Sequence, residues 1–191
     1  MFIIDASIII EDKAEKKQIG KVYINYNYRN LTQKQSKNLK FKKKFIGYKY
    51  FLKNINFLSY EPVKIKKIKQ ILIYLGSTKN TKLLKYILEI LSSNFYQKIR
   101  FKIVLGKYEK YNFKANYLKD NFFYFKNLTN QKFLKLASNC QIAIGSGGVS
   151  CWERIYLGLV NFVIITAKNQ TFATKQMNKS KYIFNLGVKN N

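Results

Sequence analysis

Residues 141–166 read QIAIGSGGVSCWERIYLGLVNFVIIT, and this stretch decides the fold. An apolar run ends in a glycine turn at 145–148, helical spacing follows over 150–157, and a second apolar run covers 162–166. Continuous apolar runs that alternate with helices are typical of parallel strands covered on both faces. The stretch therefore predicts a strand–turn–helix–strand unit of a doubly wound α/β domain.

The same alternation extends on both sides of this unit. Further strands are expected at 70–75, 100–105 and 122–125, and further helices at 81–92, 131–138 and 170–178.

Before Pro62 the pattern is less regular. Residues 2–10 and 22–28 predict strands, whereas the Lys-rich stretch 34–44 predicts a solvated loop. We therefore expect two domains, one over residues 1–63 and one over residues 64–191.

Composition limits the class of protein. The formal net charge of +27 suggests nucleic-acid binding. However, the basic residues are nearly all lysine, and no nucleic-acid-binding motif is visible, so codon bias is the favoured interpretation. With no histidine and two cysteines, a Cys/His zinc site is excluded, and we expect neither a metal nor a cofactor. No membrane span or secretory signal is visible, which indicates a cytoplasmic protein.

The glycine turn points to phosphate chemistry. A helix N-terminus offers free N–H groups and partial positive charge, so Gly145, Gly147, Gly148 and Ser150 are candidates for a pyrophosphate site. Neither the dinucleotide fingerprint nor a P-loop is present, so a plain tight turn remains open. Glu153, one turn into the helix, could accept hydrogen bonds from two ribose hydroxyls, or it could simply complement the helix dipole or pair with a lysine.

A second strand end lies at Gly76 and Ser77, before the expected helix at 81–92. These residues could hold a phosphate from the other side, or they could form an ordinary N-cap turn.

Together these residues resemble a known family. The segments 142–159 and 163–170 (IAIGSGGVSCWERIYLGL and VIITAKNQ) are similar to UDP-2,4-diacetamido-2,4,6-trideoxy-β-L-altropyranose hydrolases of pseudaminic acid biosynthesis. That family shares the two-domain GT-B fold with glycosyltransferases. The resemblance implies that residues 64–191 form a Rossmann-like UDP-binding domain and that residues 1–63 are a remnant of the N-terminal domain.

The resemblance also implies roles for single residues. Glu153 would hold the ribose, and Leu128 would lie near the uracil. Asn169 and Gln170 would face the sugar or its phosphate. The residues implied near the pyrophosphate are Gly147, Gly148 and Ser77.

The chain departs from the family in one chemical respect. The family's hydrolase uses a catalytic histidine, which this sequence lacks, so we assign no catalytic residue. We expect a chain truncated at both ends that binds a UDP-sugar without turning it over, and a separately encoded N-terminal half is a possible partner. Two alternatives remain: a glycosyltransferase-like protein of the same fold, and a basic, non-enzymatic RNA binder.

Overall fold

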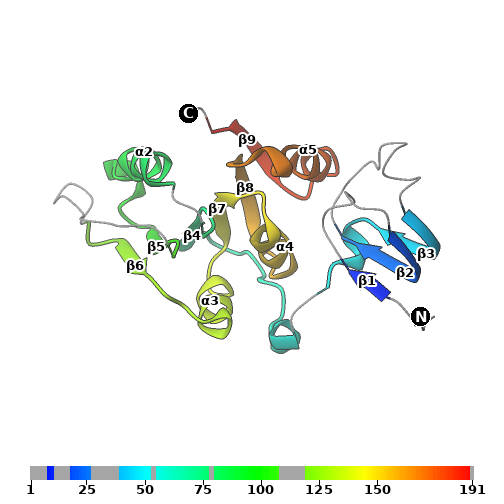
Figure 1. The fold of residues 1–191 in the computed structure, drawn as a ribbon. Coiled ribbons are helices and arrows are strands. Elements are labelled where there is room, and N and C mark those ends of the chain that lie inside the picture. Colours follow the sequence, from blue (N-terminus) through cyan, green and yellow to red (C-terminus); the bar gives the residue numbers. More distant parts are fainter. Residues whose placement is uncertain are drawn as a thin grey trace. The chain divides into compact units, whose positions relative to one another are not determined.

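The computed structural model describes residues 8–10, 18–26, 39–52, 55–77, 80–107 and 119–189. The chain forms two compact units, Met1–Lys53 and Asn54–Asn191, which we describe separately (Figure 1). The sequence suggested a boundary after residue 63, but the two compact units divide after Lys53. Phe57 is fully buried in the core of the second unit, and the Val63 N–H donates to the Leu157 carbonyl at 2.8 Å.

The first unit contains a parallel sheet of three strands in the order β1-β2-β3. The strands are β1 (Ile8–Ile10), β2 (Gln18–Asn25) and β3 (Leu39–Ile46). Short 3-10 turns follow at η1 (Tyr48–Tyr50) and, in the second unit, at η2 (Ile55–Ser59). The strands expected at 2–10 and 22–28 are described only at 8–10 and 22–26.

The prediction of a solvated loop over 34–44 is wrong for residues 39–44, which belong to β3. Leu39 is buried with Tyr23, and the Phe41 ring packs 5.2 Å from the Tyr23 ring, centroid to centroid. Lysines fill the solvent-facing positions of this strand, and charge on an outer strand opposes pairing with other chains. The high lysine content therefore hid a strand that buries Leu39 and packs Phe41 against Tyr23.

The second unit is built on a six-stranded, wholly parallel sheet, which confirms the doubly wound α/β class. Its order, β6-β5-β4-β7-β8-β9, reverses direction between β4 and β7. At such a switch point the connections leave the strand ends on opposite faces, and a crevice opens at the carboxyl edge. The strands are β4 (Gln70–Tyr74), β5 (Arg100–Val104), β6 (Phe122–Phe125), β7 (Ile142–Ser146), β8 (Val160–Ile165) and β9 (Phe184–Val188).

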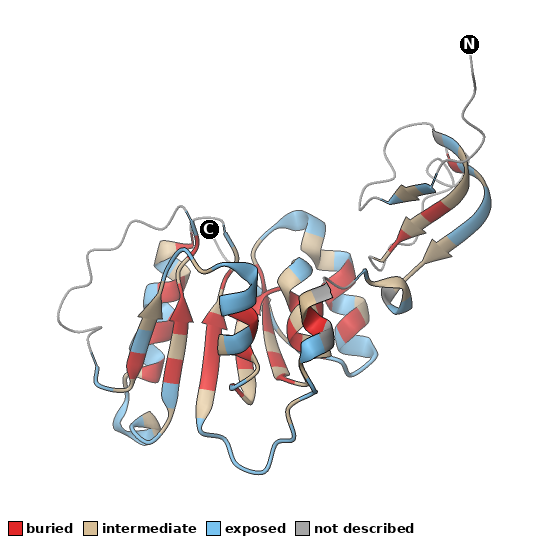
Figure 2. Ribbon diagram, turned by 90° about the horizontal axis from the view of Figure 1, so that it is seen from below, coloured by how far each residue is buried: buried red, intermediate tan, exposed pale blue. Residues whose placement is uncertain are grey.

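Helices cover both faces of this sheet, and its inner strands are largely buried (Figure 2). Leu84 and Leu88 of α2 pack with Ile71 and Ile73, whereas α3 packs on the face that carries Leu72, opposite α2. The helices and remaining 3-10 turns are α2 (Thr81–Leu91), η3 (Asn94–Tyr96), α3 (Asn130–Ala137), α4 (Val149–Tyr156), η5 (Lys168–Gln170) and α5 (Thr171–Lys179).

Two details differ from the sequence expectation. Strand β9 was not expected, because Asn185 and Gly187 interrupt its apolar pattern and Phe184 and Leu186 are exposed. Strand β7 continues through Gly145, which the sequence placed in the turn; Gly145 lies in register with Tyr74 and Val163. None of the described helices is long and apolar enough to cross a membrane.

Candidate functional site

A pocket of about 530 Å³ opens at the carboxyl ends of β4 and β7, where the strand order reverses. We call it the strand-end pocket. Most of the residues predicted from sequence line it: Gly76, Ser77, Leu128, Gly148, Ser150, Glu153 and Gln170. The residues that sequence analysis missed are Tyr74, Leu75, Asn130, Phe133, Ser146, Val149 and Thr166. Tyr74, Leu75, Ser146 and Thr166 lie at or just after the ends of strands, and this position was the signal that could have found them. The other three residues lie on helices α3 and α4.

One wall of the pocket is the N-terminus of α4. Gly148 is the N-cap residue, and Val149 and Ser150 form the first turn. The first N–H groups of a helix have no partner within the helix, and the helix dipole adds partial positive charge there. Ser77, after β4, lines the same pocket. This wall therefore favours an anion.

Gln170 presents a donor to the same place. Its Oε1 accepts hydrogen bonds from the Thr166 N–H at 3.0 Å and from the Thr166 hydroxyl at 3.2 Å. Because the oxygen is held in this way, the amide nitrogen faces the other direction, and a methyl group built on Gly148 would lie 3.8 Å from it. The side-chain amide of Gln170 is thus oriented to donate beside the α4 N-terminus.

Glu153 brings an acceptor into the pocket. Its side chain is half-buried, and among the described residues its carboxylate has neither a hydrogen bond nor a salt bridge. Burial raises the pKa of Glu153, and the adjacent Arg154 guanidinium opposes this effect. A half-buried carboxylate that has no hydrogen bond to the described residues is suited to accept hydrogen bonds from ligand hydroxyls.

The remaining wall is apolar and aromatic. The Tyr74 and Phe133 rings lie 5.2 Å apart, centroid to centroid, and Leu128 lines the pocket with them. Burial raises the pKa of Tyr74, the Glu153 carboxylate raises it further, and Arg154 lowers it, so the phenol stays protonated at neutral pH. This wall offers apolar surface for a planar ring.

Arg154 lies below the glycine turn and is completely buried. Its Nε donates to Asn161 Oδ1 at 2.8 Å, one terminal nitrogen donates to the Ser146 carbonyl at 2.9 Å, and the other donates to the Ser150 hydroxyl at 3.2 Å. The side chain therefore joins β7, α4 and β8. Sequence analysis placed Arg154 in the family motif without this role.

Gly145 and Gly147 do not line the pocket; they allow close packing beneath it. A side chain at Gly145 would meet the Tyr74 carbonyl and the Arg154 guanidinium, and one at Gly147 would meet the Thr174 hydroxyl. Asn169, predicted to face the sugar, is exposed on η5 and does not line the pocket. The described residues contain no cluster of His, Cys, Asp or Glu suited to a metal ion.

The two glycines of the turn provide a matched pair of variants. We expect Gly147→Ala to lower the free energy of unfolding by roughly 1–3 kcal/mol, because the new methyl group displaces buried Thr174. Gly148→Ala places its methyl group in ordinary van der Waals contact, so its stability should stay within about 0.5 kcal/mol of wild type. Urea denaturation measures both, and equal stabilities would show that Gly147 is not tightly packed.

The Arg154 network predicts a second stability difference. Arg154→Lys keeps the charge but cannot reach three acceptors in one plane, so it should cost roughly 2–4 kcal/mol of unfolding free energy. The same substitution at exposed Arg100 is the control and should cost less than about 0.5 kcal/mol. Thermal unfolding measures both variants. Equal losses of stability in the two would contradict a stabilising role for the Arg154 hydrogen bonds.

Comparisons with known proteins add information about the fold. No protein-family model matches the sequence, and no curated protein matches it. Among solved structures, one described as the glycotransferase of kitacinnamycin aligns with a TM-score of 0.60 at 16% identity, covering 88% of this chain and 42% of that one. The glycosyltransferase SnogD from Streptomyces nogalater aligns with a TM-score of 0.48 at 18% identity, covering 72% of this chain and 35% of its own.

The chain thus spans less than half the length of these two solved proteins. The first likeness supports the GT-B-like fold expected from the sequence. At this identity it shows a fold shared with glycosyltransferases, and function has to be argued from the site.

Proposed function

We propose that the second unit binds the nucleoside diphosphate part of a UDP-sugar in the strand-end pocket, as the nucleotide-binding half of a GT-B-type glycosyltransferase. The observation that carries this proposal is the convergence of three elements in one pocket at the switch point: the α4 N-terminus, the oriented Gln170 amide and the Glu153 carboxylate.

Each part of the ligand has a matching wall. The diphosphate would lie against the α4 N-terminus, between Ser77 and the Gln170 amide nitrogen. The ribose hydroxyls would donate to Glu153. The base would lie against Leu128 and Phe133. The choice of uridine rests on the sequence resemblance to a UDP-sugar hydrolase family.

This arrangement suits the departure of a diphosphate. When the bond between the anomeric carbon and the diphosphate oxygen breaks, negative charge grows on the leaving group. Helix N–H groups and an oriented amide that already point at this oxygen stabilise that charge without reorganising. Among the described pocket residues we assign no general base.

Two reactions share this leaving group. Transfer of the sugar to an acceptor hydroxyl is supported by the fold-level likeness to a glycosyltransferase. Hydrolysis is the second candidate, because Trp152, Glu153 and Arg154, followed by Asn169 and Gln170, match the hydrolase motif. UDP release from the altropyranose substrate without an acceptor would favour hydrolysis, whereas release that requires an added acceptor would favour transfer.

The proposal predicts selective nucleotide binding. In calorimetry with the full chain, UDP should bind more tightly than ADP, because the resemblance to a UDP-sugar hydrolase family implies a uracil beside Leu128. Inorganic pyrophosphate, which cannot use Glu153, should bind the strand-end pocket more weakly than UDP. A folded protein that gives no binding heat with millimolar UDP would refute the proposal.

We expect the substitution Glu153→Gln to weaken UDP binding and to raise the stability of the folded chain. Glu153→Gln should weaken UDP binding by roughly 1–3 kcal/mol, since a neutral amide accepts hydrogen bonds less strongly than a carboxylate. The loss should be smaller for deoxyuridine diphosphate, which lacks one ribose hydroxyl. Glu61→Gln, at an exposed site, is the control and should leave binding unchanged.

The stability effect follows from the raised pKa of Glu153. In the wild type, burial of Glu153 favours its protonated form, so its folded-state pKa is higher than its unfolded-state pKa. The stability that this difference contributes is present below the unfolded-state pKa and is lost as pH rises through the folded-state pKa. Gln cannot ionise, so Glu153→Gln should raise the melting temperature at neutral pH and have less effect in acid. A variant that is less stable than wild type at neutral pH would contradict this account.

A further inference from the structure

A second pocket, of about 430 Å³, lies on the sheet face that carries α3. Four cationic side chains surround it: Arg100 and Lys102 from β5, and Lys132 and Lys135 from α3. Among the described residues that line this pocket, none is Asp or Glu. We call it the basic pocket.

Lys102 occupies a position that a covered strand normally fills with an apolar side chain. It lies in register with Leu72, which belongs to the core under α3, and Val104, two residues further along the same face of β5, is buried in that core. Lys102 is half-buried, and its ammonium nitrogen lies 4.5 Å from the Phe123 ring centroid and 5.6 Å from that of Phe125. Cation–π attraction thus holds a charge on the core-facing side of the sheet.

The charge of Lys102 also acts on Cys140, which is buried in the core under α3. Burial raises the pKa of the Cys140 thiol to about 12, and Lys102 acts against that rise. The lysine-rich composition explains lysines at solvent-facing positions, but it does not explain one on this face. Arg100, on the same side of β5, is one of only three arginines in the sequence.

The four cations have no counter-ion in the described structure. None of them forms a salt bridge with a described carboxylate, so their mutual repulsion is not offset by the protein. Apolar side chains line the same pocket: Phe125, Leu128 and Leu136. An anion with several charges would neutralise more than one cation and would accept hydrogen bonds from guanidinium and ammonium groups together.

We propose that the basic pocket is a second anion site, which binds a phosphate or diphosphate group attached to an apolar or planar body. The multiple charges and many acceptor oxygens of phosphate suit four donors from two elements, whereas a single carboxylate would neutralise only one. The source is either a soluble phosphate ester or a phosphorylated lipid headgroup. This proposal does not rest on the function proposed for the strand-end pocket, although Leu128 lines both pockets.

Inorganic pyrophosphate titrated into the ¹⁵N-labelled full chain tests the site directly. We expect saturable shifts of backbone amides in β5 and α3, in addition to any shifts at the glycine turn. Lys132→Ala combined with Lys135→Ala should weaken the β5–α3 binding event by about tenfold or more, because two charge-assisted contacts are lost. Shifts that appear only at the glycine turn would overturn the proposal while leaving the proposed function intact.

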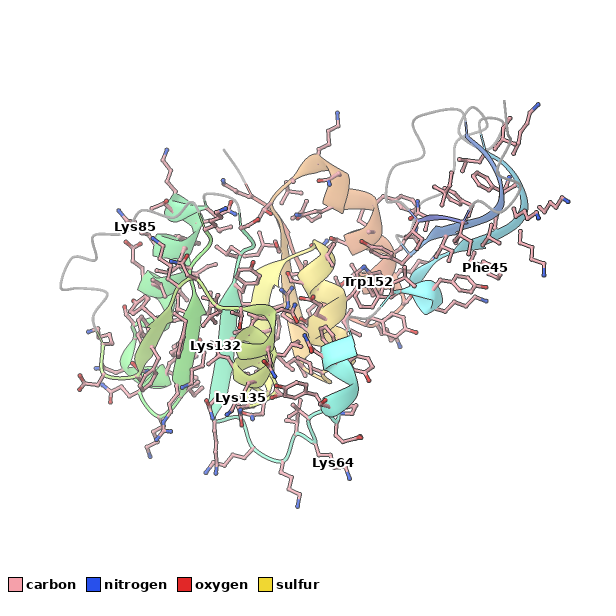
Figure 3. All side chains as sticks on the ribbon, turned by 60° about the horizontal axis from the view of Figure 1, so that its bottom comes forward. Phe45, Lys64, Lys85, Lys132, Lys135 and Trp152 are labelled. Carbon is pink, nitrogen blue, oxygen red and sulfur yellow. The ribbon has the colours of Figure 1, made fainter. Side chains whose placement is uncertain are left out.

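The chain offers a matched control for this charge change. Lys82 and Lys85 have the same spacing of three residues and are exposed on α2, which packs on the opposite face of the sheet. Figure 3 labels Lys85 on α2 and the pair Lys132 and Lys135 on α3. Replacing both with alanine should change pyrophosphate affinity less than about twofold, since distant exposed charges are largely screened. Equal losses for the two pairs would show attraction by net charge and would overturn the proposal.

Two further arms identify the source of the phosphate. If a headgroup is the ligand, vesicles containing phosphatidic acid should sediment the wild-type chain, and Lys132→Ala with Lys135→Ala should abolish this, whereas pure phosphatidylcholine vesicles should not sediment it. If a soluble ester is the ligand, pyrophosphate should bind, and Lys132→Ala with Lys135→Ala should leave sedimentation with phosphatidic acid vesicles unchanged. Absence of both pyrophosphate and vesicle binding would refute the site. Single-stranded RNA binding that both lysine pairs weaken equally would likewise argue against it.

Discussion

The carboxyl edge of the second unit depends on one buried cation, the guanidinium of Arg154. It is completely buried and donates to Ser146 at the end of β7, to Ser150 within α4 and to Asn161 in β8. Asn161 in turn donates to the Leu159 carbonyl at 2.7 Å. Removing one partner from such a network leaves buried acceptors unpaired, so strand, turn and helix are fixed together. The glycine turn has its shape because Gly145 and Gly147 leave room for this packing.

The same cation sets the electrostatics of the pocket above it. A buried positive charge and the positive end of the α4 dipole lie beneath a wall that also presents the Gln170 amide. Glu153 is the acidic residue of this pocket, and burial raises its pKa while Arg154 lowers it. An anion at the α4 N-terminus and hydroxyl donors at Glu153 would complement these charges.

The sequence alone predicted the parts that follow from local pattern. Apolar runs marked β4, β5, β7 and β8, and the glycine turn located α4 and most of the strand-end pocket. Local pattern failed where tertiary packing decided the outcome. Lysines hid β3, and Asn185 and Gly187 hid β9.

The roles of single residues were harder to predict for the same reason. Gly147 was interpreted as a ligand-facing glycine, yet it is needed for contact with Thr174, which lies 27 residues later in the sequence. Lys102 belongs to an ordinary-looking strand, and only its register with Leu72 shows that it points toward the α3 face. Such facts depend on which elements become neighbours, and spacing along the chain does not contain them.

The most direct test of the central claim is to locate bound UDP on the full chain by ¹⁵N–¹H spectroscopy. The account predicts saturable shifts of the amides at Ser77, Gly148, Val149 and Ser150, with the side-chain amide of Gln170 shifting over the same titration. Amides of α2 that face away from the pocket should not move. Saturable shifts confined to another surface, or no saturable shift at the glycine turn with millimolar UDP, would contradict the claim that this pocket binds the nucleotide.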